Sequence, residues 1–180
     1  MQAVFNPEYV LSLTKPTESF LCPLNANTFG INFQKFKIRN IEDNETILEI
    51  CNGPTPENFK LNEDDNKRKV KYELPRQFLQ LKEIGSTVEF KVGPQPVTNF
   101  RMIERHYLGD KLIKSFDFTF GFCIANSVNS WEFIYEMPHF SKQEIDEIVK
   151  NPWKVKSDSF YFNENAMIMH HKAEYMYYDN

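Results

Sequence analysis

Apolar residues alternate with polar residues along most of this chain, in short runs that end at glycine, proline or asparagine. Successive side chains of a β-strand point to opposite faces, so this alternation predicts strands with one buried face. Many short strands bounded by turn residues favour an antiparallel sandwich over a parallel α/β fold. We therefore expect an all-β protein with strands in the runs 70–74, 88–92, 100–108, 116–124, 131–137, 157–162 and 166–177.

The segment around residues 31–38 departs from strict alternation. Ile31 and Phe33 share one face of a regular strand, whereas Phe36 and Ile38 lie on the other. One extra residue in a β-bulge shifts the alternation by one position. A bulge near Gln34 would bring all four apolar side chains to the same side.

Helical signals are few. Ser141 and Glu144 form an S-x-x-E capping box, which is followed by apolar residues at helical spacing and a stop at Asn151-Pro152. A weaker helical pattern occurs at Pro7–Leu13. These signals predict one or two short helices beside the strands.

The length of 180 residues fits one domain, so we expect a single β-sandwich domain over residues 1–180. Residues 1–20 form an N-terminal segment that includes the short helical pattern. Residues 57–69 run from acidic side chains into basic ones and are typical of a solvated charged loop.

Composition and charge exclude several classes of protein. The 17 phenylalanines and 15% aromatic content are incompatible with intrinsic disorder, and a net charge of −4 disfavours nucleic-acid binding. The longest apolar run, 116–124, contains Asp117 and is too short to cross a bilayer, so we expect no stable membrane anchor. Cys22, Cys51 and Cys123 form no CxxC pair, which favours the reducing cytoplasm over a disulfide framework.

No catalytic motif is present. The chain lacks the GxSxG, GxxxxGK[ST], GxGxxG and HExxH patterns. His170 and His171 are adjacent on an expected strand, so they point to opposite faces and cannot bind one metal together. Cys123 has no neighbouring base and is expected to be a buried, inert thiol. We expect no catalysis, no metal and no cofactor.

The aromatic strands allow two interpretations. The rings either fill a large core between two sheets or leave a slot for a long apolar ligand. Glu104 shares the strand face of Phe100 and Met102, which places a carboxylate among apolar side chains. Such a carboxylate needs a partner, either an Arg or Lys in a structural ion pair or the amide of a ligand. Arg101 and Arg105 lie on the opposite face and are expected to point to solvent.

The block VEFKVGPQPVTNFRMIERHYLGDKLIKSFDFTFGFCI (Val88–Ile124) resembles the acyl-binding Unc one-nineteen proteins. These are relatives of the delta subunit of rod cyclic-GMP phosphodiesterase, a prenyl-binding protein. The similarity extends to FQKFKIRN (Phe33–Asn40), IYEMP (Ile134–Pro138), SDSFYF (Ser157–Phe162) and MHHKAEY (Met169–Tyr175), and covers nearly the whole chain.

The resemblance implies an immunoglobulin-like β-sandwich with a lipid slot between its sheets. The implied function is that of a soluble carrier for the myristoyl or lauroyl group and first residues of N-acylated proteins, including G-protein α subunits. Arf-like small GTPases in the GTP state would release this cargo. The implied location is the cytoplasm, with the cilium and the cytoskeleton as further sites.

The resemblance also implies the residues of the site. Glu104 occupies the position of a carboxylate that lies near the acylated glycine. Phe133 and Met137 stand where the family is expected to have His and Phe, which would alter the depth of the slot. The implied acyl-binding wall consists of Phe36, Ile38, Tyr72, Phe78, Ile84, Phe116, Phe133, Tyr135, Met137, Tyr161 and Tyr175.

Two other functions stay open from the residues. A prenyl carrier would use the same slot without an acylated glycine for Glu104 to hold. A filled immunoglobulin-like domain would instead bind protein partners through its surface.

Overall fold

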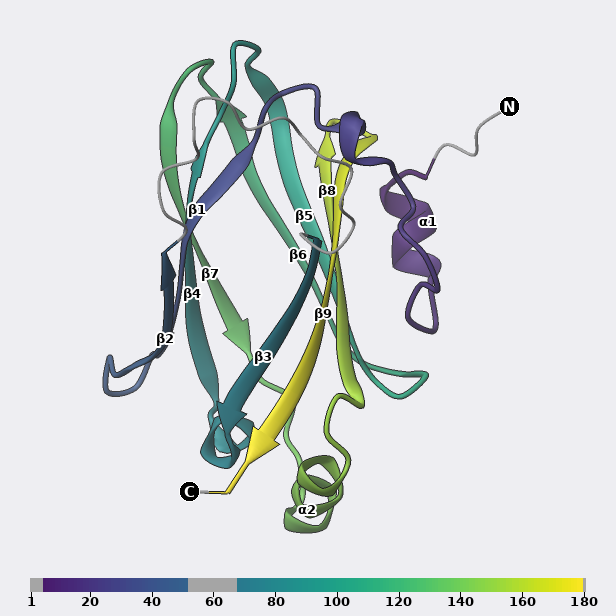
Figure 1. Ribbon diagram of the computed structural model, residues 1–180, viewed down its shortest axis with the longest axis vertical. Helices are drawn as coiled ribbons and strands as arrows, with labels where there is room; N and C mark the ends of the chain where they lie inside the picture. Colours follow the sequence, from purple (N-terminus) through teal and green to yellow (C-terminus); the bar gives the residue numbers. More distant parts are fainter. Residues whose placement is uncertain (1–4, 52–67, 180) are drawn as a thin grey trace.

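The computed structural model describes residues 5–51 and 68–179, whose strands form two facing sheets (Figure 1). The four-stranded sheet has the order β2 (Thr46–Cys51), β1 (Asn32–Asn40), β4 (Glu83–Lys91) and β7 (Val128–Glu136). The five-stranded sheet has the order β3 (Lys69–Pro75), β9 (Ala166–Tyr178), β8 (Val155–Asn163), β5 (Val97–Leu108) and β6 (Lys111–Cys123). The expected all-β sandwich is confirmed, although β3 and β9 pair in parallel rather than antiparallel.

The main core lies between the two sheets, where the alternation of the sequence turns apolar side chains inward. On β7, for example, Trp131, Phe133 and Tyr135 are buried, while the residues between them are exposed. The bulge expected near Gln34 is confirmed, because the pairing of β1 with β4 shifts between Phe33 and Lys35. As a result Phe33 and Phe36 pack against the same core.

Strand β2 is not predicted by the alternation of the sequence. It lies at the edge of the four-stranded sheet, and none of its side chains is fully buried. A strand that buries no complete face carries only a weak hydrophobic period, so its pairing with β1 is decided by the backbone.

The run of five inward side chains expected over residues 116–124 is wrong at its end. Phe116, Phe118 and Phe120 pack against the core, but Phe122 is 60% exposed and Ile124 is 65% exposed. Gly121 has a φ of +95°, and the pairing of β5 with β6 is irregular there. This kink reverses the alternation, so that Cys123 turns inward in place of Phe122.

The N-terminal segment covers the outer face of the five-stranded sheet (Figure 1). Helix α1 (Pro7–Ser12) is capped by Asn6 and places Val10 in a second apolar cluster with Ile103, Phe160 and Phe162. The central strands β5 and β8 are therefore buried on both faces.

This cover also corrects the expected position of Arg105. Its side chain is buried rather than solvent-facing, and its guanidinium donates to the Leu13 carbonyl at 2.5 Å and to Ser115 Oγ at 3.0 Å. Arg101 lies nearer the surface and forms a two-pronged ion pair with Asp117.

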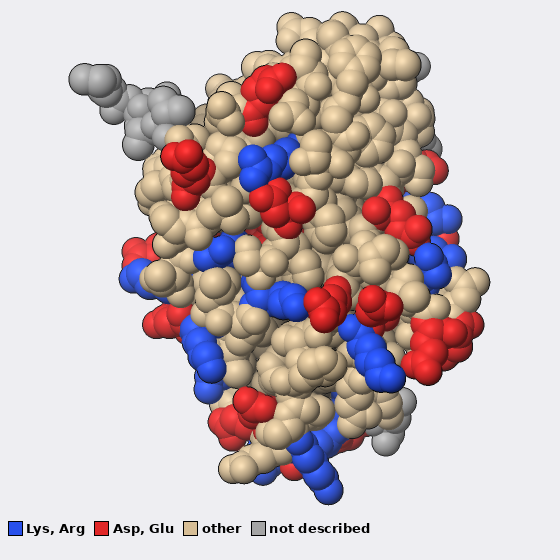
Figure 2. All heavy atoms as spheres, turned by 180° about the vertical axis from the view of Figure 1, so that it is seen from behind, with Lys and Arg blue, Asp and Glu red and all other residues tan. Residues whose placement is uncertain are grey.

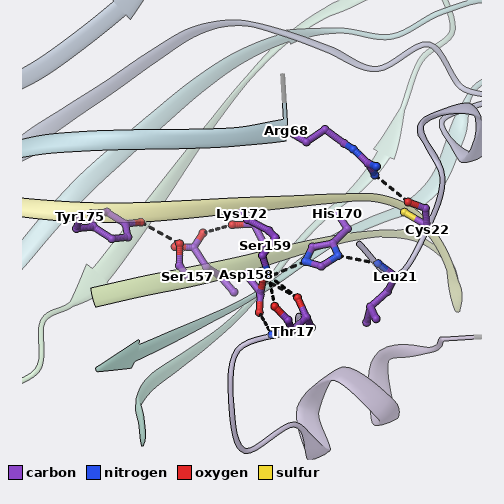
Figure 3. A network of polar contacts seen from close by, with 11 residues as sticks. Thr17, Leu21, Cys22, Arg68, Ser157, Asp158, Ser159, His170, Lys172 and Tyr175 are labelled. Carbon is purple, nitrogen blue, oxygen red and sulfur yellow. Dashed lines mark hydrogen bonds and ion pairs between the residues drawn. The ribbon is translucent and has the colours of Figure 1, made fainter. Parts of the chain in front are cut away.

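A buried polar network attaches the N-terminal segment to the sheet (Figure 3). Asp158 accepts hydrogen bonds from the Thr17 amide at 2.8 Å and from Lys172 Nζ at 2.7 Å. The Leu21 amide donates to His170 Nδ1 at 3.0 Å, so His170 Nε2 carries the proton that is donated to Asp158. Burial opposes ionisation of Asp158, but the bonds from His170 and Lys172 prevail and lower the pKa of its carboxyl.

The remaining helical elements lie at the ends of the sandwich. Helix α2 (Lys142–Lys150) begins at the predicted capping box of Ser141 and Glu144, which is confirmed. Short 3₁₀ turns occur at Leu24–Ala26 (η1) and Arg76–Gln80 (η3).

Most of the charged loop expected at residues 57–69 lies outside the described residues. At its end, Arg68 is buried and donates to the Cys22 carbonyl at 2.8 Å, and Lys69 is the first residue of β3. Of the last two residues of this segment, Arg68 is thus buried against the N-terminal segment and Lys69 belongs to the sheet.

Candidate binding site between the sheets

Glu104 lies on the inner face of β5, as its position in the strand predicts, and is surrounded by polar groups from both sheets. Its Oε1 is 2.5 Å from His106 Nε2. Its Oε2 accepts hydrogen bonds from Ser159 Oγ at 3.1 Å and from Tyr135 Oη, across the sandwich on β7, at 3.3 Å. The structure thus supplies neither an Arg nor a Lys but a histidine and two hydroxyls as the partners of this carboxylate.

Aromatic rings form a belt around the interior at the level of Glu104. Each ring contacts the next, with centroid distances between 4.5 and 5.9 Å, so that the belt passes from β1 over both edges of the five-stranded sheet to β7. Rings from both sheets therefore enclose the carboxylate. In order, the belt consists of Phe36, Tyr72, Tyr175, His106, Phe116 and Tyr135.

The rings of the belt differ in burial from the most deeply buried rings of the core. Phe90 and Phe100, between the same two sheets, are 0% exposed. By contrast Phe36, Phe116 and Tyr175 point inward but are only half-buried. Rings with accessible surface can still contact another molecule. Part of the aromatic surface near Glu104 is therefore accessible rather than sealed in the core.

The tyrosine hydroxyls of this region are neutral hydrogen-bonding groups. Burial, reinforced by the charge of Glu104, raises the pKa of Tyr135, Tyr161 and Tyr175 well above the ordinary value. Tyr175 Oη also lies 3.0 Å from Ser157 Oγ (Figure 3). The site thus combines one carboxylate, several neutral hydroxyls and a wall of rings, which suits a ligand with an apolar chain and an amide.

All eleven residues predicted to line the slot lie in the core cluster between the sheets. Their contact with lipid stays a prediction. Five of them are half-buried, namely Phe36, Tyr72, Phe116, Met137 and Tyr175. The other six are buried, namely Ile38, Phe78, Ile84, Phe133, Tyr135 and Tyr161.

His106 belongs to no motif of the sequence, yet it is the nearest partner of Glu104. The signal was available, because residues two apart on a strand share a face. Ser157 and Ser159 were also missed as site residues. Only the pairing of β8 with β5 brings Ser159 opposite Glu104.

A separate cavity of about 560 Å³ lies at the lower end of the sandwich, between η3 and α2. It is lined by Arg76, Leu79, Phe140 and Ile145, among others, and by neither Glu104 nor any predicted lining residue. This cavity is thus distinct from the aromatic belt around Glu104.

The residues considered for catalysis or metal binding do not form a reactive site. Cys123 is buried as expected, and burial raises the pKa of its thiol to about 11, which keeps it protonated. His170 faces the N-terminal segment while His171 faces the rings between the sheets, which confirms their opposite orientations. Within residues 5–51 and 68–179, no three His, Cys, Asp or Glu side chains gather as a metal site.

No helix in these ranges has the length and apolar character needed to span a bilayer.

The two-sheet sandwich thus holds a carboxylate among aromatic rings from both sheets, an arrangement that favours a binding protein. Residues 25–177 match the family described as GMP-PDE, delta subunit, and the chain belongs to this family. The resemblance found in the sequence is thereby confirmed, and family membership points to a lipid-binding carrier rather than an enzyme.

Individual relatives cover nearly the whole chain. The chain is 46% identical over 179 residues to Protein unc-119 of Caenorhabditis briggsae, covering 98% of this chain and 81% of that protein. It is 47% identical over 173 residues to Protein unc-119 of Caenorhabditis elegans, covering 95% and 78%. It is 45% identical over 178 residues to Protein unc-119 homolog B of Homo sapiens, covering 95% and 71%.

Proposed function

We propose that this protein is a carrier for N-terminally acylated proteins, which binds their myristoyl or lauroyl chain and first residues between its sheets. The observation that carries the proposal is the half-buried aromatic belt around Glu104. The rings would contact the acyl chain, and Glu104 would accept a hydrogen bond from an amide near the acylated glycine. G-protein α subunits are the proposed cargo, and the cytoplasm and cilium the proposed locations.

Energetics make such a carrier feasible. Burying one methylene contributes about 0.8 kcal/mol, so a chain of 12 to 14 carbons would gain on the order of 9 kcal/mol before ordering costs. A single myristoyl group binds a bilayer only weakly, with a constant of about 10⁴ per molar. An enclosed aromatic site with hydrogen bonds to the first peptide groups can therefore compete with membranes.

Release of the cargo requires a state with lower affinity. We propose that GTP-bound Arf-like small GTPases bind preferentially to a sandwich whose sheets have moved apart. Coupling is reciprocal. A partner that prefers the open state weakens acyl binding by some factor, and the bound acyl chain weakens binding of that partner by the same factor.

A titration of lauroylated and myristoylated peptides that begin with glycine, each compared with its unacylated twin, tests the proposal. We expect the acylated peptides to bind at least 100-fold more tightly. Equal affinities would rule out an acyl site. A farnesylated C-terminal peptide that binds more tightly than either acylated peptide would instead identify a prenyl carrier.

Variants on β6 locate the site. We expect Phe116→Asp to weaken binding of the lauroylated peptide at least 100-fold, because it places a charge in the aromatic belt. Phe122→Asp on the same strand is the matched control. Phe122 is 60% exposed, so this variant should bind the lauroylated peptide as tightly as the wild type. Tyr175→Asp should behave like Phe116→Asp. Unchanged binding in both belt variants, with the fold intact, would place the acyl site elsewhere.

Replacing the carboxylate tests its proposed role. Glu104→Ala should weaken the acylated peptide about 10- to 100-fold, as expected for the loss of a hydrogen bond to a charged group. Glu73→Ala removes an exposed carboxylate on β3 and should leave the affinity unchanged. An effect of equal size in both variants would show that only net charge matters.

A further inference from the structure

One end of the sandwich carries almost no charge. The segments 19–34, 92–100 and 118–131 contain no Asp, Glu, Lys, Arg or His. Backbone hydrogen bonds join them, from Gly93 to the Phe29 carbonyl at 2.7 Å, from Asn126 to the Gly93 carbonyl at 2.8 Å and from Val92 to the Ser127 carbonyl at 2.9 Å. These loops lie at the upper end in Figure 1, and the uppermost surface seen in Figure 2 is free of charged side chains.

The most exposed large apolar side chains of the described residues project from this end. Phe122 is 60%, Ile124 65% and Val128 58% exposed, whereas the other large apolar residues that are exposed reach at most 45%. All three belong to the β6–β7 hairpin. Scattered exposed apolar residues are ordinary, but several of them gathered on an uncharged surface indicate an interaction site.

The backbone holds these side chains outward. Gly121, at a φ of +95°, reverses the alternation of β6, so that Cys123 enters the core and Phe122 and Ile124 point away from it. Regular alternation would have placed Phe122 between the sheets. The exposure is thus built into the hairpin.

The chemistry of this end fits a lipid bilayer better than a protein surface. Hydrocarbon strongly disfavours charged groups, and the three joined segments supply none, although the adjoining β8–β9 turn brings Glu164 to the Asn99 carbonyl. Side chains next to the apolar residues, such as Asn126, Ser127 and Asn129, are polar but uncharged and suit the headgroup level. We propose that this end contacts membranes, with Phe122, Ile124 and Val128 inserted into the bilayer interface. It would place the carrier against the membrane with which acylated cargo is exchanged.

The lack of basic residues gives the proposal a distinctive signature. Peripheral proteins that bind through Lys and Arg prefer anionic lipids and are released by salt. The uncharged end contains neither Lys nor Arg, so binding should be similar for neutral and anionic vesicles and should persist at high salt.

Sedimentation of the full chain with vesicles tests this inference. Phosphatidylcholine vesicles and vesicles with added phosphatidylserine are compared at 0.1 and about 0.5 M salt, a range over which electrostatic screening becomes strong. We expect similar partitioning under all these conditions. The combined variant Phe122→Ser, Ile124→Ser and Val128→Ser should reduce partitioning at least tenfold. Ile50→Ser with Ile134→Ser is the matched control, since both side chains are exposed but Ile50 lies on β2 and Ile134 near the other end of β7 from Val128.

A second measurement separates this inference from the proposed carrier function. The combined variant should bind a lauroylated peptide in solution as tightly as the wild type, and should unfold at the same urea concentration. If it is poorly folded, Phe122→Ser alone replaces it, with a smaller expected loss of partitioning.

Several results would overturn the inference. These are no binding of the wild type to either vesicle, binding only to anionic vesicles with release by salt, or equal binding of the wild type and the combined variant. Dimerisation of the wild type that the combined variant abolishes, without vesicle binding, would assign the surface to self-association instead.

Discussion

At the scale of single residues, the position of a side chain on its strand decided more than its chemical type. Glu104 and His106 share the inner face of β5, and their contact follows from that spacing alone. Arg101 and Arg105 share the outer face, yet Arg105 is buried because the N-terminal segment covers it. The sequence therefore predicts which residues lie together but not which of two faces is covered.

His171 provides a prediction about pH. Its ring packs against Phe33 and Tyr161, and burial, assisted by the charges of His170 and Arg68, lowers its pKa to about 4. In the unfolded chain His171 binds a proton near pH 6.5, whereas in the folded protein it binds one only near pH 4. The free energy of unfolding should therefore fall as pH drops through this window, by at most about 3 kcal/mol from this residue.

Urea denaturation at several pH values between 7 and 4.5 measures this loss. His171→Phe keeps a ring of similar size but cannot be protonated, so its stability should fall less steeply with acidity. The remaining slope should include His170, whose pKa is also lowered, chiefly by burial. Identical pH slopes for the variant and the wild type would show that His171 does not carry the effect.

At the scale of elements, irregularities of the strands were predicted unequally. The bulge at Gln34 followed from a conflict within the sequence, because two apolar pairs fell on opposite faces. The sequence shows no such conflict near Gly121, because the apolar alternation continues unbroken through Phe122 and Ile124. Only the pairing of β6 with β5 shows where the alternation reverses.

Gly121→Ala tests the backbone of this hairpin. An added Cβ would meet no atom within 4 Å, so any cost must come from the φ of +95°, which L-residues rarely adopt. We expect a loss of about 1–2 kcal/mol in the free energy of unfolding, measured with urea. The control is Gly109→Asn, because the φ of Gly109 is +59°, a left-handed conformation that asparagine tolerates. Equal losses in the two variants would contradict this explanation.

Asp158→Ala tests the attachment of the N-terminal segment. The substitution removes the common acceptor of Thr17, His170 and Lys172, whose buried donors then lose their partner. We expect a loss of about 3 kcal/mol and faster hydrogen exchange over residues 7–21. The matched control is Asp117→Ala, whose more exposed pair with Arg101 should contribute about 1 kcal/mol or less. Unchanged exchange in this segment would show that apolar packing alone holds it.

At the scale of the whole molecule, the rings between the sheets include fully buried ones, such as Phe90 and Phe100, and half-buried ones near Glu104, such as Phe36 and Phe116. A ligand that binds among the half-buried rings from both sheets binds only the folded state. At 100 times its dissociation constant, such a ligand stabilises a protein by about 2.7 kcal/mol. The lauroylated peptide should therefore raise the urea midpoint in proportion, and the unacylated peptide at the same concentration should not.

The variant Phe116→Asp is the control for this rise in the urea midpoint. The variant should lose the stabilisation by the acylated peptide even at concentrations that saturate the wild type. A shift of equal size for acylated and unacylated peptides would indicate binding to the surface rather than to the interior.

The sequence by itself determined the local features of this protein. Alternation gave the two-sheet sandwich, the S-x-x-E pattern gave α2, and strand parity placed Glu104 on the inner face of β5. The three uncharged segments were also visible, but nothing in the linear order showed that they meet. Periodicity and capping depend on neighbours a few residues apart, which is why one sequence suffices for them.

Only the tertiary structure decided which surfaces are covered and which groups meet. The bond from the Thr17 amide to Asp158 joins residues 141 positions apart, and Tyr135 reaches Glu104 from the opposite sheet. The parallel pairing of β3 with β9, the ring contacts of the aromatic belt and the outward turn of Phe122 depend likewise on how distant strands come together. Burial belongs to the assembled sheets, so it cannot be read from the periodicity of any one strand.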